Sequence, residues 1–183
     1  MWQPDPVRQK NADYTVEDVL NLPADAPRVE LVDGVMVVVP SPSPDHQDIA
    51  GLLWHWLRRN APDRYRASYA IGVSVSLKST FEPDVVLFDR DAFGGNHYLP
   101  PDRVVLVVEV VSPGSRKQDR LVKPVDYGRA GIPYYWRIEQ DPVHLFAYRL
   151  SKDGAYDLMA DSAELLELDE PFEIKLPVSE ITP

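Results

Sequence analysis

The chain has 183 residues, with 19 Lys and Arg against 29 Asp and Glu, and a formal net charge of −10. This length suits one domain over residues 1–183, and the 44% hydrophobic and 26% charged residues argue against a disordered or fibrous chain. The sequence contains no cysteine, which excludes disulfides, thiolate nucleophiles and zinc-finger ligand sets.

The N-terminal residues show no pattern of export. Residues 1–11 are polar and contain two prolines, without the charged and then apolar order of a secretory signal. No apolar run approaches the roughly 18 residues that cross a bilayer. We expect a soluble, cytoplasmic protein with no membrane partner, whose residues 1–13 form a flexible arm.

The first predicted elements are a short helix and a hairpin. Thr15 is a favourable N-cap for a helix over residues 15–22. The segments 28–32 and 35–39 flank Asp33-Gly34, a dipeptide typical of tight hairpin turns.

An amphipathic helix is predicted from about Pro44 to Asn60, because apolar residues recur there at helical spacing. Ser43 and Asp45 are both candidates for its cap. Apolar and β-branched segments follow, separated by turn residues. The strands predicted from them are 65–69, 72–77, 84–88, 134–139, 143–150, 156–159 and 165–168.

The segment Val104–Val111 is the predicted central strand, because its nearly continuous apolar run is typical of a strand buried on both faces. The mostly polar stretch 118–130 is the predicted crossing helix, ended by Gly131 and Pro133. Helices before and within a run of strands indicate an α/β or α+β fold, with helices on the faces of a sheet.

Glu109 is the most informative residue, since it lies inside that aliphatic strand. A buried ionised carboxylate needs a partner, and a metal ion is the partner we expect. The alternative is a strand-end Glu that reaches solvent or pairs with an Arg. Strand alternation places Glu109 on one face with Val105, Val107 and Val111.

Two further carboxylates are candidates for the same site. Asp84 opens a second aliphatic strand and would converge with Glu109 if the two strands are neighbours, although Pro-Asp also begins many ordinary turns. Glu30 is the third candidate, or else it lies on the solvent face of the hairpin. Such carboxylates, with a backbone carbonyl, form a hard oxygen site suited to Mg²⁺ or Mn²⁺.

A series of short motifs runs from about residue 14 to residue 148. They are Glu30 to Gly34, a Ser/Pro stretch followed by His46, Pro83-Asp84, Glu109 to Pro113, Asp119 with Lys123 and Tyr127, and Gly131 to Trp136. In this order they resemble the Uma-type family of restriction-endonuclease-like proteins, which is placed in the PD-(D/E)XK nuclease superfamily. The resemblance implies a mixed central sheet flanked by helices, with additional strands, and metal-dependent hydrolysis of phosphodiester bonds in nucleic acid, with DNA expected.

The resemblance also implies the ligands of the metal. Asp84, Glu109 and the main-chain carbonyl of Val110 would bind the cation, with Glu30 nearby. The superfamily lysine is expected two residues after Glu109, where this sequence has Val111.

Lys123 is the substitute that the resemblance implies, with Asp119 and Tyr127 as accessory residues on the same helical face. Pro124 predicts that the helix is kinked there or begins there. The alternative for Lys123 is a solvated surface cation. His46 is expected to contact the site or a phosphate, or else to be a local cap or surface group.

Residues 114–137 carry six basic and two acidic side chains. We expect this basic segment to bind the phosphate backbone of nucleic acid, although charge runs are often only solvated faces. A homodimer is also compatible with the composition. Two alternatives remain open: a noncatalytic or weakly active nuclease-like binding or regulatory protein, and a phosphoesterase for small substrates.

Overall fold

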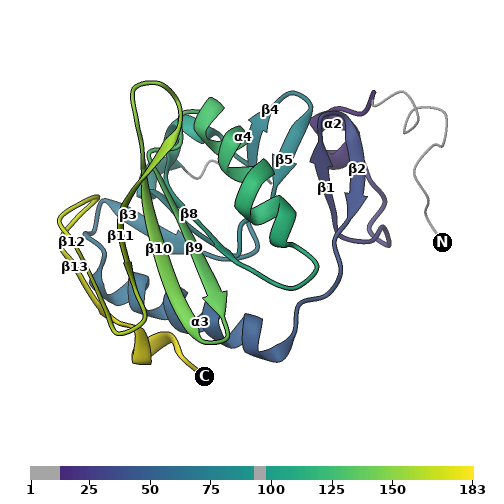
Figure 1. The fold of residues 1–183 in the computed structure, drawn as a ribbon. Coiled ribbons are helices and arrows are strands. Elements are labelled where there is room, and N and C mark those ends of the chain that lie inside the picture. Colours follow the sequence, from purple (N-terminus) through teal and green to yellow (C-terminus); the bar gives the residue numbers. More distant parts are fainter. Residues whose placement is uncertain (1–12, 93–97) are drawn as a thin grey trace.

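A six-stranded sheet forms the centre of the computed structural model, which describes residues 13–92 and 98–183 (Figure 1). Its strands are β3 (Tyr65–Ser68), β6 (Val85–Asp89), β8 (Val104–Val110), β9 (Tyr134–Gln140), β10 (Val143–Leu150) and β11 (Tyr156–Ser162). They lie in the order β11-β10-β9-β8-β6-β3, and within this sheet β8 and β9 are the parallel pair. The expected mixed sheet of an α+β fold is therefore confirmed.

A second sheet and a hairpin lie beside the central sheet. The second sheet contains β1 (Val29–Val32), β2 (Val35–Val38), β4 (Gly72–Ser76), β5 (Ser79–Phe81) and β7 (Tyr98–Leu99) in the order β2-β1-β5-β4-β7. The hairpin contains β12 (Leu165–Leu168) and β13 (Ile174–Pro177). The sequence did not predict β5, β7 or β13, which have only three, two and four residues.

The helices agree closely with their predicted positions, with one exception in length. They are α2 (Val16–Leu20), α3 (Pro44–Asn60) and α4 (Lys123–Arg129), and α4 continues directly from a π-helical turn at Gln118–Val122. Short 3₁₀ turns lie at Arg90–Ala92, Pro101–Arg103 and Val178–Ile181. The helix predicted over residues 15–22 is only five residues long because the chain turns after Leu20, ahead of Pro23.

The central sheet is covered on both faces (Figure 1). On one face, α3 and the β12–β13 hairpin pack on a cluster that includes Leu53, Leu106 and Trp136. On the other face, α4 and the second sheet pack on a cluster that includes Val107 and Tyr127. The strand β8 is thus buried on both sides, as its continuous apolar run predicts.

A β-bulge changes one predicted face of β8. Its register with β6 shifts between Leu87 and Phe88, so that Leu87 pairs with Leu106 and Phe88 with Val104. Val105 is the extra residue and packs towards the α3 side, whereas Val107 packs towards α4. The prediction that Val105 and Val107 share one face of the strand is therefore wrong, because a bulge interrupts strand alternation.

The flexible arm predicted for residues 1–13 lies, apart from Asp13, outside the described residues. None of the helices in residues 13–92 and 98–183 is long and apolar enough to cross a membrane.

Candidate active site

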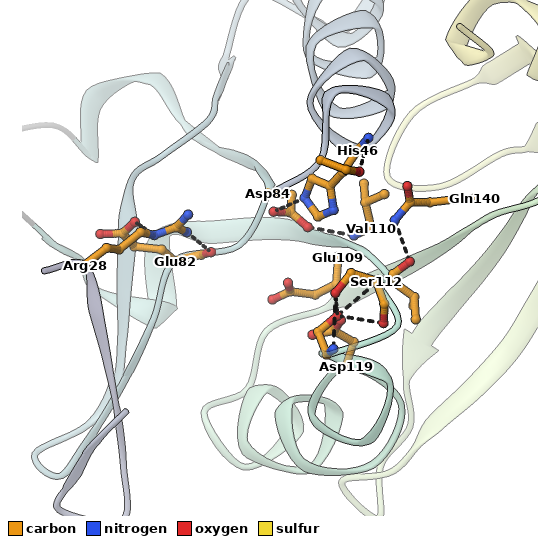
Figure 2. Close-up of polar contacts among 12 residues, drawn as sticks. Arg28, His46, Glu82, Asp84, Glu109, Val110, Ser112, Asp119 and Gln140 are labelled. Atoms are coloured by element: carbon orange, nitrogen blue, oxygen red, sulfur yellow. Dashed lines mark hydrogen bonds and ion pairs between the residues drawn. The ribbon is translucent and has the colours of Figure 1, made fainter. Parts of the chain in front are cut away.

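Asp84 and Glu109 lie at the ends of neighbouring strands. β6 and β8 pair directly, with Val85 opposite Val108. Asp84 lies just before β6 and Glu109 lies near the end of β8, so both side chains reach one cavity of about 480 Å³ (Figure 2). The predicted convergence of two aliphatic strands is confirmed. We call this space, lined by Glu30, Asp84, Glu109, Asp119 and Lys123, the acidic cavity.

The Glu109 side chain is only 3% exposed, yet both of its oxygens have partners. Lys123 Nζ lies 3.0 Å from Oε2, and the Tyr127 hydroxyl donates to Oε1 at 2.6 Å. The alternative of solvent contact or pairing with an Arg is therefore wrong. Burial raises the pKa of Glu109 well above its ordinary value of 4.5, and Lys123 offsets part of this shift.

Lys123 reaches the acidic cavity from a helix that changes its winding. The amide of Lys123 donates to the carbonyl of Gln118, five residues earlier, which closes the π-helical turn. Pro124 then lies in the first turn of α4, where its missing N–H removes few helical bonds. The α-helix thus begins at Lys123, one residue before the start predicted from Pro124, and it continues directly from the π-helical turn.

Three carboxylates surround the Lys123 ammonium group. Nζ lies 3.0 Å from Glu109 Oε2, 3.0 Å from Glu30 Oε1 and 3.5 Å from Asp119 Oδ1. Burial alone would lower the pKa of Lys123, but Glu109, Glu30 and Asp119 together raise it above its ordinary value, so the side chain stays protonated. Because Lys123 is 6% exposed, the alternative of a solvated surface cation is wrong.

Glu30 and Asp119 are also buried acids of the cavity. Glu30 Oε1 accepts a 3.3 Å hydrogen bond from the Glu82 amide, and only 8% of Glu30 is exposed, so it does not lie on a solvent face. Burial raises the pKa of Asp119, and its Oδ1 is buried without a hydrogen bond. The Asp119 main-chain carbonyl accepts a hydrogen bond from the Tyr135 hydroxyl on β9.

Asp84 is held by a backbone group and by a histidine. Its Oδ2 accepts from the Val110 amide at 2.7 Å, and its Oδ1 lies 2.9 Å from His46 Nε2 (Figure 2). Ser43, rather than Asp45, caps α3, because its hydroxyl accepts from the His46 amide at 3.3 Å. The first turn of α3 therefore positions His46 against Asp84.

The loop after β8 is fixed by residues that the sequence did not single out. Gln140 Nε2 donates to the Val111 carbonyl at 2.7 Å, and the Ser112 amide donates to the Ser115 hydroxyl at 2.9 Å (Figure 2). Gln140 ends a strand 29 residues after Val111, and a single polar residue there gives no sequence signal. These contacts set the path of the chain from the acids to the helix that carries Lys123.

The basic residues of segment 114–137 do not gather at the acidic cavity. Lys123 is the one that lines it, whereas Arg120, Arg129 and Arg137 line a second cavity on the other side of α4.

The donor set suits a hard divalent cation. Glu30, Asp84, Glu109 and Asp119 supply carboxylate oxygens, and Lys123 contacts three of them. Asp119 Oδ1 is buried without a hydrogen bond, 3.5 Å from Lys123 Nζ, and burial is the main cause of the raised pKa values of Glu109 and Asp119. A divalent cation bound beside these oxygens would offset the cost of burying them. Within the described ranges no three His, Asp or Glu side chains form a ready ligand cluster, so main-chain or water oxygens would have to complete the coordination.

The chain has a mixed sheet, with acids at the ends of two paired strands and the Lys123 ammonium group beside them. This arrangement is that of a restriction-endonuclease-like domain. The Uma2 family model, described as "Putative restriction endonuclease", matches residues 16–179, and the chain belongs to this family.

Similarity of fold extends to a solved structure. A protein from Anabaena variabilis, described as "a putative nuclease belonging to DUF820", has a TM-score of 0.70 at 18% sequence identity, covering 91% of this chain and 96% of that chain. At this identity the similarity shows the fold alone. No curated protein matches the sequence.

Proposed function

We propose that the protein is a nuclease that uses Mg²⁺ or Mn²⁺ to hydrolyse phosphodiester bonds in nucleic acid, with DNA as the substrate. The observation that carries this proposal is the meeting of Asp84 and Glu109, from paired strands, with Lys123 in one cavity. Membership of the Uma2 family supports the same reaction class.

Asp84 and Glu109 would hold the cation, with the Val110 carbonyl as a third ligand and Glu30 nearby. When bound, the cation supplies a Lewis acid and lowers the pKa of water. His46 and the Val110 amide keep Asp84 oriented, and Tyr127 fixes Glu109 by its 2.6 Å hydrogen bond.

Lys123 is the residue we assign to charge stabilisation. It remains protonated and is one of the residues that line the acidic cavity, so it is placed to stabilise negative charge on a phosphate that enters there. Val111, in the superfamily lysine position, is 4% exposed and apolar and takes no part. The helix thus supplies the cation that the strand lacks.

Cleavage of supercoiled and single-stranded DNA with Mg²⁺ or Mn²⁺ tests the proposal. Wild-type protein should cleave, whereas Asp84→Asn and Glu109→Gln should lose at least about a hundredfold in rate, as expected when a group essential to transition-state stabilisation is removed. Asp48→Asn, an exposed change on α3, serves as the matched control and should cleave like wild type. Equal cleavage by wild type and Glu109→Gln would refute the assignment.

Calorimetry with Mn²⁺ separates the alternatives. Binding that is lost in Asp84→Asn, without cleavage of any DNA, would favour the nuclease-like binding or regulatory protein. Cleavage of small phosphodiesters alone would favour the phosphoesterase. Homodimer formation also remains a prediction, and sedimentation of wild-type protein tests it.

A further inference from the structure

A second cavity, of about 470 Å³, lies on the opposite side of α4 from the acidic cavity. Its walls are α4 on one side and the loop between β10 and β11 on the other, with the sheet as its floor. We call it the arginine–tyrosine pocket, after the residues Arg120, Arg129, Arg137, Tyr135, Tyr148 and Tyr156 that line it. A volume of this size accommodates a small organic ligand.

The width of the pocket is set by direct contact between backbones. A Cβ atom at Gly128 would lie only 2.7 Å from the carbonyl oxygen of Gly154, so the helix and the loop touch where Gly128 has no side chain. Gly154 itself has a φ of +84°, which glycine adopts without strain.

The floor of the pocket consists of fixed aromatic rings. Tyr135 and Tyr148 stack at 5.8 Å between centroids, and Tyr156 lies 5.6 Å from Tyr135. The hydroxyl of Tyr156 donates to the Ile132 carbonyl at 2.7 Å, which holds its ring in place. Tyr135 is only 2% exposed, whereas Tyr148 and Tyr156 are half-buried. The accessible parts of Tyr148 and Tyr156, held in this way, offer a surface for another planar group.

The walls of the pocket carry guanidinium groups that share few acids. Arg120 makes two hydrogen bonds to Glu139, at 2.8 and 3.1 Å. Arg137 Nε lies 3.2 Å from the same carboxylate but is buried without a hydrogen bond, and its guanidinium lies 4.4 Å from the centre of the Phe146 ring. The Glu139 carboxylate is therefore the ion-pair partner of both Arg120 and Arg137.

Arg129 is the most accessible of the three cations. Its side chain is 76% exposed, and its nearest acid is Asp126 at 3.6 Å. Among the residues that the structure describes, Asp153 is the one acid that lines the pocket, and its carboxylate already accepts hydrogen bonds from the Ser151 hydroxyl and the Ala155 amide. The lining thus has two more cations than anions.

We propose that the arginine–tyrosine pocket binds a nucleotide, with the base on the tyrosine and Arg137 surface and the phosphate at Arg129 and Arg120. Planar rings and arginines are the combination that binds unpaired nucleotides irrespective of sequence. The nucleotide belongs either to an unpaired segment of a nucleic acid or to a free nucleotide pool. Binding here does not require cleavage at the acidic cavity.

Fluorescence anisotropy of a labelled single-stranded oligothymidylate, with a chelator present, tests this site without any cleavage. Arg129→Glu and Tyr148→Ala should each weaken binding about tenfold, within the range found when a stacking side chain or phosphate contact is lost. Arg58→Glu is the matched control, because it reverses an exposed charge in the last turn of α3, on the other face of the sheet. It should bind within about twofold of wild type.

Competition with adenosine monophosphate and with a blunt duplex identifies the source of the nucleotide. Displacement by the mononucleotide alone assigns the pocket to free nucleotides, and displacement by unlabelled single strands assigns it to unpaired nucleic acid. Equal weakening by Arg129→Glu and Arg58→Glu, or tighter binding of duplex that neither pocket variant affects, would overturn the proposal. Because Arg129 is exposed, Arg129→Glu tests the site even if Tyr148→Ala unfolds.

Discussion

Replacing Lys123 with Met tests the electrostatics of the acidic cavity most directly. The substitution keeps an unbranched side chain in a site where only 8% of the side chain is exposed, and it removes the ammonium group that lies 3.0–3.5 Å from three carboxylates. Removing one partner of a buried ion pair costs about 3–5 kcal/mol. We expect Lys123→Met to lower the free energy of unfolding by that amount, and the melting temperature by roughly 6–20 °C.

Urea unfolding at neutral pH with a chelator measures this loss, and Lys117→Met is the control at the exposed residue just before the π-helical turn. Added Mg²⁺ should recover part of the stability of Lys123→Met, because a bound cation compensates the same acids. In a double-mutant cycle, Glu109→Gln should cost less in the Lys123→Met background than alone. A loss below about 1 kcal/mol would refute the reasoning, since it would place Lys123 within the range of ordinary substitutions.

Three further predictions concern stability. Burial raises the pKa of Glu109 in the folded protein, so the folded state binds more protons than the unfolded state above pH 4.5. The free energy of unfolding without metal should therefore fall as the pH rises from there. Urea titrations at several pH values measure this fall, and Glu109→Gln should flatten it. Gly128→Ala should cost about 1–3 kcal/mol in thermal unfolding, because its methyl group meets the Gly154 carbonyl, and an unchanged melting temperature would contradict that contact. Ser43→Ala should cost about 1 kcal/mol through loss of the α3 cap, against no measurable effect of Ser41→Ala in the same assay.

The sequence predicted the elements whose patterns are long. The apolar period over Pro44–Asn60 gave α3 with its bounds, and the continuous run of β8 gave the central strand. In contrast, β5 and β7 are too short for any period to appear. Besides its neighbour β4, β5 pairs with the distant β1, and β7 pairs with the distant β4. The bulge at Val105 depends on the register with β6, which no single strand specifies.

The candidate site was only partly predictable for a similar reason. An acid inside an aliphatic strand marked Glu109, and Pro83-Asp84 before another such strand marked Asp84. Lys123 was identified from the family resemblance, because nothing in its local sequence indicates burial. Its aim depends on the π-helical turn before it, which adds a residue that helical spacing does not reveal.

The helix between the two cavities has a thermodynamic consequence. Asp119 and Lys123 line one cavity, whereas Arg120 and Pro124, each one position further along, line the other. A ligand that shifts this helix when it binds in one cavity changes the affinity of a second ligand for the other cavity. Reciprocity then requires both occupants to influence each other by the same free energy.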